Sequence, residues 1–165
     1  MQSKRMMMLL LAAELAFGPR IFAADAASKS KSEPHRSKII QIEEETVPWA
    51  DAPASIPAGV KIAVLEGDPA KEGLFTLRLK VPEGTRIMPH WHPKDERVTV
   101  LSGTVRVGFG DVFEIEKTEA FESGGYYVNP AKVHHFNYFE EDSIIQVTGI
   151  GPWGIHYVAS GAGSK

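Results

Sequence analysis

Two histidines and a glutamate lie close together near the middle of the 165-residue sequence. His90 and His92 are separated by one residue, so in a β-strand both side chains would point to the same face. Glu96 follows shortly after, and a short turn through the intervening residues could bring its carboxylate towards the same point. Two imidazoles and a carboxylate that converge make a site for a divalent transition metal.

A third histidine about forty residues later could complete this site. His134 and His135 are adjacent, so in a strand they would point to opposite faces and only one could face the metal. Imidazole nitrogen and carboxylate oxygen suit one divalent ion of Mn, Fe, Ni, Zn or Cu, and the sequence does not choose among these metals. Three imidazoles and one carboxylate leave a net charge of about +1 on the centre, and an ion that prefers six ligands keeps open positions for a small molecule.

The spacing of these residues resembles the first conserved motif of the cupin family. From Gly84 to Gly103 the sequence reads G-x5-H-x-H-x3-E-x6-G, which matches that motif at every fixed position. The second cupin motif is matched in part, at Gly124, Pro130 and His135. It departs from the motif where Lys132 replaces the usual glycine and Phe139 replaces the usual asparagine.

The resemblance implies a fold, a domain boundary and a set of ligands. The fold would be all-β, an antiparallel double-stranded β-helix (jelly-roll or cupin barrel), over residues 59–160. The register of the second motif selects His135 over His134, so the implied metal ligands are His90, His92, Glu96 and His135. The closing run Gly149–Gly154 is similar to that of small secreted single-domain bacterial cupins.

The resemblance also implies two classes of function. The first is a metal-dependent enzyme of the oxygenase, isomerase or lyase type, acting on a small organic substrate at a centre of three histidines and one glutamate. The second is a non-catalytic cupin module that binds or senses a small ligand or a metal. Fold and ligand set do not separate these two classes, because unrelated functions share one fold.

The hydrophobic pattern supports the all-β class independently of the motifs. Residues 75–81 alternate apolar and polar side chains, which is typical of a half-buried strand. Similar short runs recur up to residue 158, and two of them, at 39–42 and 112–115, predict an edge strand and a barrel strand. Many closely spaced short strands indicate a sandwich or barrel.

Four residues are candidates for a substrate pocket beside the metal. Strict alternation would place Met88 on the face of His90, and Asn137 on the face of His135. Gln146 and Thr148 share one face of a late strand and could orient a substrate. The alternative is that these side chains face solvent.

The composition excludes some classes of protein. Hydrophobic residues make up 43% of the chain and charged residues 24%, as in ordinary globular proteins. The formal net charge of −3 argues against a nucleic-acid partner, which would require a basic surface. The sequence contains no cysteine, which excludes thiolate ligands and disulfides.

The first residues predict export from the cytoplasm. A basic start, an apolar run and an alanine-rich exit indicate a signal peptide over residues 1–24. Residues 25–58 are interpreted as a linker and N-terminal extension, because residues 26–38 are rich in Ser, Lys, Ala and Pro. The protein is therefore predicted to be periplasmic or secreted, without stable membrane insertion. Its apolar segment at residues 39–42 favours a homodimer, since an exposed sheet edge must be paired or covered.

Overall fold

The computed structural model describes residues 39–159, so the predicted signal peptide lies outside the described residues. Within this part of the chain the regular elements are β-strands and two short 3-10 turns, η1 (Glu44–Thr46) and η2 (Ile115–Lys117). The predicted all-β class is therefore confirmed. No helix among the described residues has the length and apolar character needed to cross a membrane.

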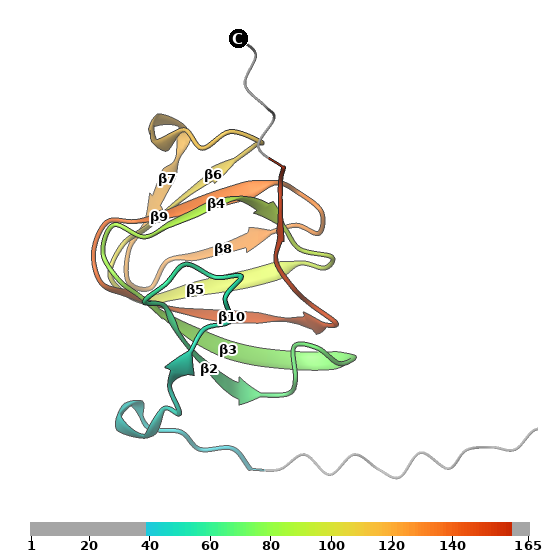
Figure 1. Cartoon of the computed structure of the whole chain (residues 1–165). Coiled ribbons are helices and arrows are strands. Elements are labelled where there is room, and N and C mark those ends of the chain that lie inside the picture. Colours follow the sequence, from blue (N-terminus) through green and yellow to red (C-terminus); the bar gives the residue numbers. More distant parts are fainter. Residues whose placement is uncertain (1–38, 160–165) are drawn as a thin grey trace, which may run out of the picture. The chain divides into compact units, whose positions relative to one another are not determined.

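The strands form two antiparallel sheets, and Figure 1 shows the two layers. The larger sheet has the strand order β1-β2-β3-β10-β5-β8, with strands β1 (Ala50–Asp51), β2 (Lys61–Glu66), β3 (Gly73–Val81), β10 (Ser143–Gly151), β5 (Glu96–Ser102) and β8 (Tyr126–Asn129). The smaller has the order β11-β4-β9-β6-β7, with strands β11 (His156–Tyr157), β4 (Arg86–Trp91), β9 (His135–Phe139), β6 (Val105–Phe109) and β7 (Glu119–Phe121). This is the predicted antiparallel jelly-roll.

The hydrophobic core lies between the two sheets. Alternate residues of β3 and β10 face it, and Phe75 and Val147 are both fully buried. The smaller sheet contributes Val105 and Phe139, which lie opposite each other in the β6–β9 pair. Because the interior of this barrel is filled by apolar side chains, polar residues inside it need specific partners.

One glycine of the first motif has a clear structural role. Gly103 follows β5 and adopts a φ of +78°, a conformation that favours glycine. A Cβ atom at this position would lie 2.3 Å from Ser143 Oγ and 2.7 Å from the carbonyl oxygen of Asp142. The turn therefore admits only glycine without rearrangement, and it leads the chain from one sheet to the other.

Two of the predicted strands are absent from the structure. Residues 112–115 do not pair with a strand, because Gly110 takes the chain out of β6 with a φ of +123°. Phe113 of this segment instead covers the outer face of β9, where it packs on Phe136 with ring centroids 5.1 Å apart. Residues 39–42 also form no strand, since β1 is the strand that pairs with the free side of β2.

The N-terminal extension is described from residue 39 onwards. Part of it is ordered against the barrel, because β1 pairs with β2 and Val47 is buried. The predicted boundaries of the linker and the barrel stay predictions.

Candidate metal centre

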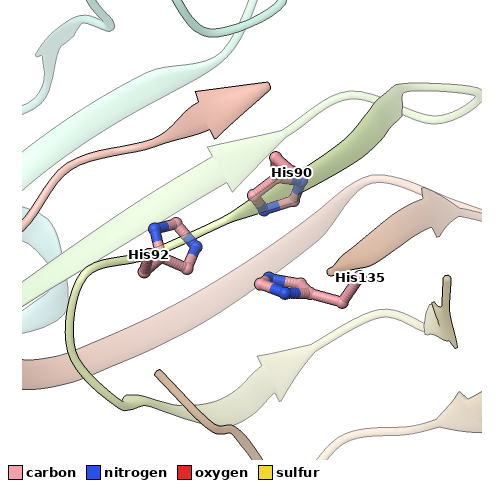
Figure 2. A group of neighbouring side chains, drawn as sticks. All are labelled: His90, His92 and His135. Atoms are coloured by element: carbon pink, nitrogen blue, oxygen red, sulfur yellow. The ribbon is translucent and has the colours of Figure 1, made fainter. Parts of the chain in front are cut away.

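Three histidine side chains converge at one end of the smaller sheet (Figure 2). His90 belongs to β4, His92 directly follows this strand, and His135 begins β9. His90 and His135 lie opposite each other in the β4–β9 pair, and their ring centroids are 4.2 Å apart. The three rings offer nitrogen atoms within 4.8 Å of one another, a spacing comparable with the ~4.2 Å between ligands on opposite sides of one ion.

Backbone carbonyl groups fix the orientation of all three imidazoles. The Nδ1 atoms of His90, His92 and His135 donate to the carbonyl oxygens of Met88, Gly154 and Val133, at 2.8, 2.8 and 3.0 Å. A carbonyl oxygen can only accept, so each Nδ1 carries a proton, and Nε2 is the nitrogen that offers a lone pair when the ring carries no second proton. Hydrogen bonds of this kind orient metal-binding histidines and raise their basicity.

Glu96 is the first residue of β5 and comes from the opposite sheet. Its Oε2 atom lies 3.5 Å from Nε2 of His92 and 3.6 Å from Nε2 of His135. Burial raises the pKa of this carboxyl group, but the facing imidazoles of His135 and His92 outweigh burial and hold the pKa well below its usual range. Glu96 is therefore an anionic side chain that both sheets enclose.

Asn129 holds the carboxylate of Glu96, and the sequence analysis did not predict a role for this residue. Asn129 ends β8 directly opposite Glu96, and its Nδ2 donates to Oε2 of Glu96 at 2.7 Å. The side chain is only 1% exposed, and its Oδ1 has no hydrogen-bond partner among the described residues. The sequence feature that could have identified Asn129 is its position immediately before Pro130 of the second motif.

The donor set fits a divalent cation. The Nε2 atoms of His92 and His135 are buried and have no hydrogen-bond partner among the described residues. Leaving a buried acceptor unpaired costs about 1–3 kcal/mol, so two such atoms at one point are unfavourable unless something binds them. A cation would bind both lone pairs and also offset the buried negative charge of Glu96. Imidazole and carboxylate donors suit the predicted group of Mn, Fe, Ni, Zn and Cu.

The adjacent histidine lies outside the centre. His134 hydrogen bonds through Nδ1 to a carboxylate oxygen of Asp111, and its side chain is partly exposed. His135 is 0% exposed. The structure thus brings together His90, His92, Glu96 and His135 and leaves His134 on the other side of its strand; their role as metal ligands stays a prediction.

One of the four predicted pocket residues lies inside the barrel. Asn137 is 6% exposed and sits opposite Ile87 in the β4–β9 pair. The buried Tyr127 on β8 is its neighbour across the interior. Burial and the charge of Glu96 raise the Tyr127 pKa well above its usual value, which outweighs the opposing hydrogen bond to Asn137. Tyr127 and Asn137 therefore give the interior neutral hydrogen-bonding groups beside the carboxylate.

The other three predicted pocket residues do not face the centre. Gln146 accepts from Arg78 at 3.2 Å and Thr148 lies 3.4 Å from the hydroxyl of Thr76, on the outer face of the larger sheet. Met88 is 49% exposed, because a bulge in β4 between Ile87 and His90 breaks the alternation on which its prediction depended. Assigning Gln146, Thr148 and Met88 to the substrate pocket was therefore wrong.

The C-terminal segment adds an aromatic wall to the centre. The Trp153 ring stacks on the His92 ring, with centroids 4.3 Å apart and an angle of 16° between the planes. Its other contact is with Phe75 of the core, at a centroid distance of 5.4 Å. Trp153 therefore packs against the face of the His92 ring, while the Gly154 carbonyl accepts the hydrogen bond from its Nδ1.

The fold is the jelly-roll barrel of the cupins. The polyketide cyclase RemF from Streptomyces resistomycificus has a similar fold, with a TM-score of 0.61, 14% identity, and coverage of 76% of this chain and 89% of that chain. An acetylacetone dioxygenase from Acinetobacter johnsonii is similar with a TM-score of 0.59 and 16% identity, over 83% of this chain and 86% of that chain. At these identities the likeness shows the fold, which is the one that the cupin resemblance of the sequence implied.

The chain belongs to the family described as a domain of unknown function, DUF4437, whose sequence profile matches residues 13–152. Among curated proteins, germin-like protein 3-1 of Oryza sativa subsp. japonica is 37% identical over 68 residues. That match covers 41% of this chain and 30% of the rice protein, so the chain spans less than a third of that relative.

Acid should destabilise the metal-free protein. Burial, followed by electrostatic repulsion from the neighbouring His135 ring, lowers the His90 pKa from 6.5 to about 3. Between pH 6.5 and pH 3 the His90 side chain is protonated in the unfolded chain but not in the folded chain. The free energy of unfolding therefore falls as pH decreases from 6.5 towards 3. Between pH 7 and pH 5 this one group should remove about 2 kcal/mol. Urea unfolding of chelator-treated protein at both pH values measures it. The same pH dependence in His90→Gln would contradict the assignment to His90.

Proposed function

We propose that this protein is a metal-dependent enzyme that converts a small organic substrate at the centre formed by His90, His92, Glu96 and His135. The observation that supports this most strongly is the pair of unpartnered, buried Nε2 atoms beside an ionised glutamate. A site that binds no ion would gain no stability from leaving these two nitrogen atoms unpaired. The fold of acetylacetone dioxygenase and polyketide cyclase structures supports a cupin enzyme without selecting a reaction.

The chain's own residues have separate tasks in this proposal. The three imidazoles would hold the ion through Nε2, and Glu96 would provide the negative charge that keeps the centre near +1. Asn129 holds the carboxylate in place, while Tyr127 and Asn137 offer neutral hydrogen bonds to a substrate in the interior. When bound, the divalent ion supplies Lewis acidity and open coordination positions for a small molecule.

A protein nucleophile is not part of the proposal. The sequence has no cysteine, and no serine lies in a Gly-x-Ser-x-Gly elbow. The side chains that face Glu96 are two imidazoles and an amide. Their chemistry favours a reaction of the oxygenase, isomerase or lyase type that depends on the ion, and it leaves the choice among these types to experiment.

Metal analysis followed by substrate screening tests the proposal. Protein isolated from its native compartment should carry a single divalent ion per chain, and turnover should depend on reloading that ion after chelation. O₂ consumption is the first readout, since it separates an oxygenase from an isomerase or lyase. Full turnover by stripped protein, with residual metal excluded by elemental analysis, would refute the metal-dependent mechanism. A stable metal with no turnover of any small organic substrate class would favour the alternative, a binding or sensing module.

Export and dimerisation remain proposals as well. The predicted periplasmic or secreted location depends on residues outside the described part of the chain. The predicted homodimer is supported by Ile39 and Ile40, whose side chains are 90% and 49% exposed and would gain from contact with a second copy.

A further inference from the structure

Across four neighbouring strands of the smaller sheet, one aromatic residue lies on each side of the pair His90 and His135. Tyr157 of β11 lies opposite His90, His90 lies opposite His135, and His135 lies opposite Phe109 of β6. Residues directly opposite each other in antiparallel strands share a face of the sheet. Tyr157, His90, His135 and Phe109 therefore form one row, which is called the aromatic row below.

The ring distances agree with this register. The Tyr157 ring centroid lies 5.9 Å from that of His90, and the Phe109 centroid lies 6.5 Å from that of His135. The two residues directly outside the metal ligands on this sheet are thus both aromatic. The neighbouring residues in β11 and β4, His156 and Trp91, point to the opposite face of the sheet, where their rings stack with centroids 4.3 Å apart. This agrees with Tyr157 and His90 sharing the inner face.

Phe109 and Tyr157 differ from the histidines in their exposure. Phe109 is 55% exposed and Tyr157 is 42% exposed, whereas His90 and His135 are 2% and 0% exposed. A residue that faces the barrel interior and yet stays half-exposed lies at the rim. The rim beside the metal ligands therefore carries two large apolar surfaces in contact with solvent.

The chemistry of this rim favours one class of ligand. Neither Phe109 nor Tyr157 carries a charge at neutral pH, because a phenol ordinarily titrates at about pH 10. The strands β11 and β6 are separated by β4 and β9, which places their backbones about 14 Å apart. A flat ring or conjugated chain that reaches the histidines between these strands can pack against the aromatic side chains on either side.

We propose that Phe109 and Tyr157 form the entrance to the metal centre and select substrates with a planar, apolar portion next to their metal-binding oxygen atoms. This inference rests on the proposed metal centre and adds the class of substrate. The planar portion would lie against the two rings, and the oxygen atoms would reach the ion between the histidines. Phe109 and Tyr157 are thus specificity residues that contact the substrate and not the metal.

A pair of chelating probes tests the entrance directly. Acetylacetone and benzoylacetone bind metals through the same two oxygen atoms, and only benzoylacetone carries a phenyl ring. Zinc-loaded protein should bind benzoylacetone about tenfold more tightly than acetylacetone. Phe109→Ala and Tyr157→Ala should each reduce this ratio several-fold with little change in the dissociation constant of acetylacetone or of zinc. Tyr157→Phe keeps the ring and should retain the wild-type ratio.

Tyr126→Ala is the matched control. Tyr126 is 56% exposed, as Phe109 is, but lies on the outer face of the larger sheet opposite Thr99. Its replacement should leave the ratio unchanged. The entrance proposal is overturned if Phe109→Ala and Tyr157→Ala leave the ratio unchanged, or if zinc-loaded protein binds neither probe. Failure to bind zinc would instead remove the metal centre itself, so the two failures are distinguishable by the zinc titration.

Discussion

Replacing His135 with alanine should lower the affinity for Zn²⁺ or Mn²⁺ by more than about 100-fold, the upper limit typical for loss of a partner outside the ligand shell. The Nε2 atom of His135 is buried, lacks a hydrogen-bond partner among the described residues, and lies 3.6 Å from Glu96. Alanine at this position removes one of three converging nitrogen atoms. Competition titration with a chromophoric chelator measures the dissociation constant.

His134→Ala provides the control for that experiment. It removes an imidazole from the neighbouring residue, and its side chain bonds to Asp111 outside the centre. The dissociation constant of the metal should stay within about threefold of wild type, since the substitution touches no proposed ligand. Equal losses in His134→Ala and His135→Ala would show that the strand, and not the ligand, was disturbed. A loss only in His134→Ala would show that the register of the second motif was misassigned.

Phe139→Ala should reduce the free energy of unfolding by about 3–5 kcal/mol, the usual cost of deleting a fully buried phenylalanine. Phe139 is 0% exposed and lies opposite Val105 between the sheets. Its removal leaves a cavity that the rigid strands on both sides cannot close. Urea unfolding monitored by circular dichroism gives the value for the metal-free protein.

Phe109→Ala removes the same side chain from the same sheet and should cost less than about 1 kcal/mol, because Phe109 is 55% exposed. The comparison separates a phenylalanine that stabilises the core from one that is available to a ligand. Equal costs for the two substitutions would mean that the rim at Phe109 is part of the core, and would contradict both assignments.

Period-two alternation predicted the centre well where strands are regular. His90 and His92 converge, and the adjacent His134 and His135 separate to opposite sides of β9. It failed at Met88, because an extra residue in β4 changes which face the side chains occupy. Pro89 was the signal for this irregularity, since proline cannot donate to a ladder hydrogen bond and is confined to edges and bulges.

The errors at Gln146 and Thr148 have a different cause. The interior of a small barrel is packed with apolar side chains, so the apolar residues Ile145 and Val147 take the inner face of β10 and the polar residues take the outer face. This alternation of apolar and polar residues along β10 is visible in the sequence, and it favours the alternative that Gln146 and Thr148 face solvent. Asn129 could not be identified in this way, because its contact with Glu96 depends on a pairing of β5 with β8 that no local pattern reveals.

The segment after β10 determines at what stage of translation this centre can be completed. His92 is held by the Gly154 carbonyl and the Trp153 ring, and Tyr157 lies beside His90. A ribosome adds these three residues only after the strands β1 to β10 have been made. A nascent chain that ends before Trp153 would hold His92 without its hydrogen-bond acceptor or its stacking partner. The complete arrangement around the three histidines therefore forms only after translation has passed β10, so we expect an ion that depends on this arrangement to bind after the barrel strands have been synthesised.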